Sequence, residues 1–184
     1  ETADLVALGT AQVRALTGNA IANLSTDEVV ALTTAQFAAL SSAQVARLTS
    51  DQVAALQTED LAALNTLQIR ALGTAAIAAL TSDEIIALTT AQVAALTTAQ
   101  VVAITTADIA VMQTDDLRAL PVASFRALTS DQLAALSSDQ LAALGTSQFA
   151  SLSTLQISNM STADLNALTT AQFASLTTAQ IAAL

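Results

Sequence analysis

Apolar residues recur along this chain at a fixed interval of eight positions. Every residue whose number is divisible by eight, from Leu8 to Leu184, is Leu, Ile or Met, and the residue three places before it is always Leu, Val, Ile or Phe. Small and polar residues stand between them, and the consensus unit reads TTAQVAAL. The 184 residues therefore form 23 octads (184 / 8 = 23). A unit this short can bury its apolar face only against neighbouring units.

The spacing within an octad predicts a short helix. In the octad that starts at Thr97, Val101 and Ile104 are three residues apart and share one helical face, whereas a strand would need apolar residues two apart. Thr97 and Gln100 have the spacing of a capping box, and Leu96 can pack on Val101 as a hydrophobic staple. We expect about six helical residues per octad, too few to be stable without packing on other octads.

One long continuous helix would not bury this pattern. Eight residues advance the apolar stripe by about 80° beyond two full turns, so the stripe would face no single partner. Pairs of Thr or Ser, and Gly9, Gly73 and Gly145, interrupt the run instead. We predict an all-α solenoid, a superhelix of short capped helices with the right-handed sense common among helical solenoids. Residues 1–184 are expected to be a single repeat array cut from a longer chain.

The eight positions of an octad have different expected environments. Positions five and eight form the predicted core along the whole chain, because no polar residue occurs at either position. Position seven is Ala in 17 of the 23 octads, which indicates close packing that requires a small side chain. Positions three and six accept charged and polar residues and are predicted to be exposed.

A second period of 56 residues, or seven octads, lies over the first. Two sets of residues keep this spacing: Arg14, Arg70 and Arg126, and Asp4, Asp60 and Asp116. Either a block of seven octads was duplicated, or seven octads complete a whole number of superhelical turns, such as two turns of about 3.5 octads. Both explanations disfavour a two-layer zigzag of alternating octads.

Composition excludes several functions. Fifteen acidic residues against five arginines and no lysine give a net charge of −10, which disfavours nucleic-acid binding. The chain has no His, Lys, Cys, Tyr or Trp, so its hydroxyl groups have no usual base to activate them. We expect no enzymatic activity and no catalytic residues. The apolar fraction is 53%, yet no apolar run approaches the ~18 residues of a membrane span.

The residues that suggest metal, haem or ice binding each have a structural explanation as well. Adjacent acids occur in the first turn of four predicted helices, where the helix dipole stabilises negative charge. No EF-hand loop follows them. These pairs are Asp27 and Glu28, Glu59 and Asp60, Asp83 and Glu84, and Asp115 and Asp116. Met112 and Met160 are the only haem ligands available and occupy core positions. The regular Thr pairs suggest an ice-binding surface, but one Thr of each pair is needed to cap a helix. We predict no cofactor and no metal.

One octad departs from the consensus. Residues 121–128, PVASFRAL, begin with Pro121 and carry Ser124 where Gln is usual. Arg126 in this octad and Arg118 in the preceding one share position six, and they form a candidate cationic patch for a partner. The structural alternative is sequence drift at a tolerant boundary, because Pro is accepted in the first turn of a helix.

The repeated LTTAQ segments resemble the arrays of very large repetitive bacterial proteins that are labelled as surface, adhesion or haem-utilisation exoproteins. This resemblance covers all 23 octads and implies a bacterial origin and an extracellular or cell-surface location. The segment LTTAQVVAI, from Leu96 to Ile104, also resembles the helix opening of TAL effector repeats. That similarity ends after nine residues, and the base-reading loop and basic surface of those repeats are missing.

Near-equivalent units without reactive side chains are typical of a structural role. We therefore predict a non-catalytic spacer or stalk within a larger exported protein, and a protein-interaction scaffold for an unknown partner as the alternative. The terminal octads follow the same apolar consensus as the others. We expect these uncapped ends to associate with other copies, in a head-to-tail manner that can propagate.

Overall fold

The structure is a computed structural model that describes residues 2–184, and these residues form short α-helices and no strand. Contacts divide the chain into two units, residues 1–95 and 96–184. The helices of the first unit are α1 (Thr2–Val6), α2 (Thr10–Ala15), α3 (Gly18–Ala22), α4 (Thr26–Val30), α5 (Thr34–Ala39), α6 (Ser42–Val45), α7 (Ser50–Ala54), α8 (Thr58–Ala63), α9 (Thr66–Ala71), α10 (Thr74–Ala78), α11 (Ser82–Ala87) and α12 (Thr90–Ala95).

The second unit continues with one helix in each octad. Its helices are α13 (Thr98–Ala103), α14 (Thr106–Val111), α15 (Thr114–Ala119), α16 (Val122–Arg126), α17 (Ser130–Ala134), α18 (Ser138–Ala143), α19 (Thr146–Ala150), α20 (Thr154–Ser158), α21 (Thr162–Ala167), α22 (Thr170–Ala174) and α23 (Thr178–Ile181). Across residues 2–184, the predicted count of one helix per octad is therefore confirmed, with four to six residues in each helix.

The helix boundaries follow the predicted capping chemistry. At the start of α13, the Thr97 hydroxyl accepts the backbone N–H of Gln100 at 3.3 Å, and the Gln100 Oε1 accepts the backbone N–H of Thr97 at 2.9 Å. At its end, Ile104 has extended dihedrals and its N–H donates to the Val101 carbonyl. The N-cap residue is extended in both α4 and α13, whereas the C-cap residue is extended in α13 and helical in α4, so the chain leaves the helix in two different ways.

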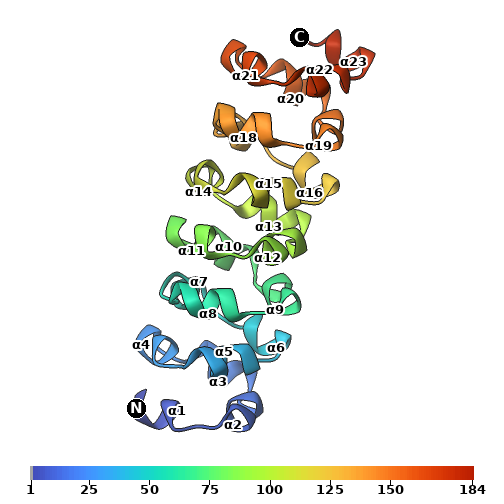
Figure 1. Cartoon of the computed structure of the whole chain (residues 1–184). Coiled ribbons are helices and arrows are strands. Elements are labelled where there is room, and N and C mark those ends of the chain that lie inside the picture. Colours follow the sequence, from blue (N-terminus) through green and yellow to red (C-terminus); the bar gives the residue numbers. More distant parts are fainter. Residues whose placement is uncertain (1) are drawn as a thin grey trace. The chain divides into compact units, whose positions relative to one another are not determined.

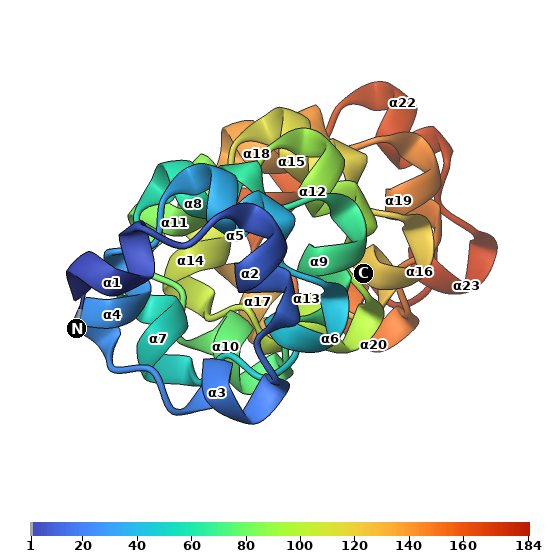
Figure 2. The ribbon, with the colours of Figure 1, turned by 90° about the horizontal axis from the view of Figure 1, so that it is seen from below.

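Within each unit the chain coils so that most helices pack on the third one along. The contacting pairs include α2 with α5, α5 with α8 and α8 with α11 in the first unit, and α13 with α16 and α16 with α19 in the second. Figure 1 shows these successive turns of short helices. Figure 2 looks from the N-terminal end, where α1, α2, α3 and α4 follow one another clockwise as they recede, so the coil of the first unit is right-handed.

Positions five and eight form the core wherever a turn of helices lies on both sides. On α8, which packs on both α5 and α11, Leu61 is fully buried, and Leu64, which follows this helix, is 2% exposed. The prediction that these positions are buried along the whole chain was wrong at the ends, because no further turn covers the last helices. There Phe173 is 36% exposed and Leu184 is 52% exposed. Leu5, in the first turn, is only half-buried.

Position seven of one octad packs against position two of the octad three places earlier. Arg47 and Asn159 show this contact, because the Asn159 amide donates to the Ser130 hydroxyl at 3.1 Å and a methyl group at Gly18 would lie 2.7 Å from Cγ of Arg47. Arg47 is the only arginine at position seven, and Gly18 is the only glycine at position two. The usual Ala at position seven is therefore explained by the Thr or Ser side chain that it faces.

This pairing gives a first prediction. Gly18→Thr should destabilise the chain by about 1–3 kcal/mol, because the new side chain overlaps Arg47 and close-packed positions tolerate added atoms poorly. Combining it with Arg47→Ala restores the usual Thr and Ala pair and should recover most of that loss. Urea denaturation of the two single variants and the double variant measures the coupling. Additive effects of the two substitutions would contradict the proposed contact.

Candidate functional site

The surface offers no enclosed site within the described part of the chain. Residues 2–184 contain no pocket and no group of three or more acidic side chains placed to hold a metal ion. None of the helices in this range is long and apolar enough to cross a membrane. The candidate chemistry therefore lies in the exposed charges and in the polar groups buried between turns.

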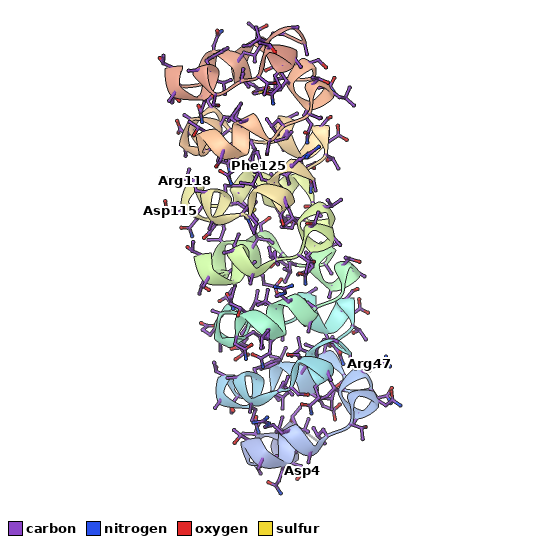
Figure 3. All side chains as sticks on the ribbon, turned by 90° about the vertical axis from the view of Figure 1, so that its right-hand side faces the viewer. Asp4, Arg47, Asp115, Arg118 and Phe125 are labelled. Carbon is purple, nitrogen blue, oxygen red and sulfur yellow. The ribbon has the colours of Figure 1, made fainter. Side chains whose placement is uncertain are left out.

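The two arginines of the candidate patch are both exposed but lie on consecutive helices. Arg118 is on α15 and Arg126 is the last residue of α16. Figure 3 shows Arg118 beside Asp115, which is three residues earlier on the same helix. Asp116 also belongs to α15, so this helix carries more negative than positive charge. The structure thus places Arg118 near the acidic side chain of Asp115, and the cationic patch stays a prediction.

Each of the adjacent acid pairs is divided between two environments. In the pairs of α8, α11 and α15 the first acid is exposed, and the second, at position four, is at most 4% exposed. Glu28, in the first turn of the coil, is only half-buried. Its pKa is lowered because the carboxylate accepts the backbone N–H and the hydroxyl of Ser25. The two carboxylates of a pair therefore point to different environments and do not form one site.

Position four also carries a series of buried glutamines that join successive turns. The Gln92 Nε2 donates to the carbonyl oxygens of Leu61 at 2.9 Å and Leu64 at 2.7 Å, both four octads earlier. Gln44 and Gln172 make the same pair of bonds in the two units. Helices pack on the third helix along while glutamines reach the fourth, so one turn takes between three and four octads.

That spacing agrees with one explanation of the 56-residue period. Seven octads would complete two turns of about 3.5 octads each, which places equivalent side chains above one another. Within the first unit, Arg14 and Arg70 are separated by this interval, and both are exposed. Duplication of a seven-octad block is compatible with the same observation and stays open.

The glutamine bonds were missed by the sequence reasoning, although a signal was present. A capping box accepts Gln or Glu equally at its fourth position. Gln occupies position four in 13 octads and Glu in only two. The preference for the amide indicates that its N–H₂ group is used as well as its oxygen. Gln92, for example, uses its oxygen for its own helix cap and its nitrogen for the preceding turn, and Gln44 does the same.

Acidic residues at this position lack the donor. Glu84 is 2% exposed; its Oε2 accepts the backbone N–H of Thr81 at 2.6 Å, and its Oε1 is buried without a hydrogen-bond partner. Asp116 Oδ1 is likewise buried without a hydrogen-bond partner. Asp60 is 2% exposed, and burial raises its pKa. A hydrogen bond from the Thr34 side chain lowers this pKa, and the nearby charge of Glu59 raises it, but burial has the largest effect. These carboxylates weaken the contact between turns.

The raised pKa of Asp60 gives a second prediction. Because the folded protein holds this proton more tightly than the unfolded chain, the penalty of Asp60 is fully present above the raised pKa and disappears as the pH falls below the unfolded value. Asp60→Asn should therefore stabilise the chain at about pH 7 and lose this advantage at about pH 3. Thermal unfolding across this range measures it, with exposed Asp51→Asn as the control. A constant difference between Asp60→Asn and the parent would contradict the prediction.

These features define an α-helical tandem-repeat protein in which each octad is one capped helix. The ALTTAQ repeat model matches residues 1–34, 21–58, 53–90, 85–114, 109–146 and 157–184. The chain therefore belongs to the ALTTAQ repeat family, which confirms the resemblance to LTTAQ-type arrays. A comparison with curated proteins gave no match.

Proposed function

We propose that this chain is a non-catalytic structural spacer, a stalk segment of a larger exported bacterial protein built as one continuous superhelix. The observation that carries the proposal is the repeated contact of each helix with the third one along, joined by glutamines that reach the fourth. In such an arrangement every added octad extends the array by the same amount without enlarging its core.

The absence of a pocket among residues 2–184 supports a role without a bound substrate. The polar residues at positions one and four cap the helices and join turns, and the apolar residues at positions five and eight fill the core, as in the octad of Gln92 and Val93. Repeat number then becomes the variable that a longer protein can change to set the distance between its other parts.

The length of the molecule tests this proposal. Deleting residues 97–152 removes seven octads, which leaves the period of the remaining octads intact. A spacer should lose about three tenths of its maximum dimension in small-angle X-ray scattering, in proportion to seven octads of 23. A compact domain would shrink by only about 13%, because its radius grows slowly with chain length. The smaller change would overturn the proposal.

The proposed location needs a separate experiment. Limited proteolysis of intact bacterial cells that produce the full protein should remove an epitope placed in this array while a cytoplasmic marker stays intact. Protection of the epitope until the cells are lysed would contradict export and would leave the spacer role to the scattering experiment.

A protein-interaction scaffold is the second candidate function, and two exposed leucines favour it. Leu67 is 69% exposed and Leu155 is 65% exposed, each at position three of its octad, where small or polar residues are usual. Each of these leucines gives a partner an apolar side chain to bury, which stabilises association. Pull-down with the parent and with a Leu67→Ala and Leu155→Ala double variant tests this candidate function. If only the parent recovers one specific partner, the scaffold role replaces the spacer role.

A further inference from the structure

Charges of opposite sign lie on different sides of the first unit. Its described acids occur only on α1, α4, α7, α8 and α11, whereas its arginines lie on α2, on α9 and two residues after the end of α6. In Figures 1 and 2, α4, α8 and α11 lie toward the left of the unit, and α2, α6 and α9 lie toward its right. The coil thus separates its charges into two stripes.

We define the acidic stripe as Asp27, Glu59 and Asp83, and the arginine stripe as Arg14, Arg47 and Arg70. All six side chains are exposed. The acids occur on α4, α8 and α11, so they are separated by four and then three octads. The arginines belong to the octads of α2, α6 and α9 and follow the same steps of four and three.

The equal steps follow from the coil. A turn takes between three and four octads, so residues of one side return after alternating steps of three and four along the chain. The two stripes therefore advance along the unit with the same spacing. A second coil placed beside the first can set one stripe against the other and bring several opposite charges together at once.

We propose that two copies of this chain associate side by side, with the arginine stripe of one copy against the acidic stripe of the other. Complementary stripes fix the relative position of partners and disfavour wrong ones. Each exposed ion pair is weak, but several pairs that form at once between two copies strengthen one another by multivalency. This inference goes beyond the spacer role, which a single separate coil would also fulfil, and it implies that stalks form bundles.

Charge exchange tests the proposal. Variant A carries Arg14→Glu and Arg70→Glu, and variant B carries Asp27→Arg and Glu59→Arg. We expect the parent to show concentration-dependent association by sedimentation velocity at about 50 mM salt and to lose it at about 500 mM salt, because surface charges are screened. Variants A and B should each remain monomeric alone and associate when mixed. Circular dichroism confirms that both variants fold.

A matched control separates the stripes from net charge. Variant A makes the chain more negative by four charges, and so do four Ala→Glu substitutions at the exposed positions 54, 75, 78 and 134, on α7, α10 and α17, which do not pack on the arginine-bearing helices α2 and α9. This control should still associate. Three results would overturn the proposal: the control fails to associate, A does not associate with B, or the parent is strictly monomeric at about 1 mM in low salt.

End-to-end packing is distinguished by a separate variant. Leu5→Glu with Leu184→Glu places charge at the uncovered apolar ends and should leave side-by-side association unchanged. If this variant abolishes association while variant A does not, the copies join through their ends, and the stripes are not the interface. The scattering test of the spacer is made at high salt and does not depend on this result.

Discussion

Val93→Asp should destabilise the chain by at least about 4 kcal/mol. Val93 is fully buried on α12, which packs on α9, so the substitution removes an apolar contact and places a carboxyl group where nothing is available to pair with it. Thermal and urea unfolding, followed by circular dichroism, should show the loss. In a repeat array the damage is expected to spread to the helices in contact first.

The same helix provides the control for this prediction. Ala91 is exposed at position three of the same octad, and Ala91→Asp adds an acid to the first turn of α12, where negative charge is favourable. Its stability should stay within about 0.5 kcal/mol of the parent. Hydrogen exchange should show α9 and α12 losing protection in Val93→Asp while α2 keeps more of its own. Equal effects of the two substitutions would mean that position five is not the core.

Exchanging the acid and the amide at position four should change stability in opposite directions in neighbouring octads. Glu84→Gln should stabilise the chain by about 1–3 kcal/mol, because the unpartnered Oε1 becomes an N–H₂ group that can donate to the carbonyls of Val53 and Leu56, four octads earlier. Gln92→Glu should cost a similar amount, because it removes the donor to Leu61 and Leu64.

Size and capping are almost unchanged by these two substitutions, so they isolate the bond between turns. Urea unfolding midpoints measure both effects, and the double variant should lie near the parent because the two sites are in separate octads. Asp83→Asn, on the exposed neighbour of Glu84, is the control for removing one negative charge. A stabilisation by Asp83→Asn as large as that by Glu84→Gln would indicate a general charge effect, and the bond between turns would then carry little energy.

The candidate site was predictable only in part. The exposure of Arg118 and Arg126 was expected from their tolerant position six and is confirmed. Their relation to other charges was not, because neighbours around a coil depend on how many octads complete a turn. Asp115 beside Arg118 is a local feature of one helix and could have been noticed in the sequence. The two charge stripes need the pitch of the coil as well as the sequence.

The sequence by itself determined the elements of this protein. Most octads carry a capping residue such as Thr97 with Gln100, so local chemistry fixes where those helices begin, and the three-residue spacing of Val101 and Ile104 fixes which face is apolar. Helices such as α10 and α16 begin without a side-chain cap.

Only the tertiary structure decided which octads meet. The angle between successive helices accumulates along the chain, and it brings the third and fourth octads along into contact. That choice gives the Gln92 amide its carbonyl partners, leaves Glu84 with a buried oxygen unpaired, and sets Gly18 against Arg47. These pairs are about thirty residues apart in the sequence. No pattern within one octad can specify them, because all octads carry nearly the same residues. The octads differ mainly in which other octads the coil places against them.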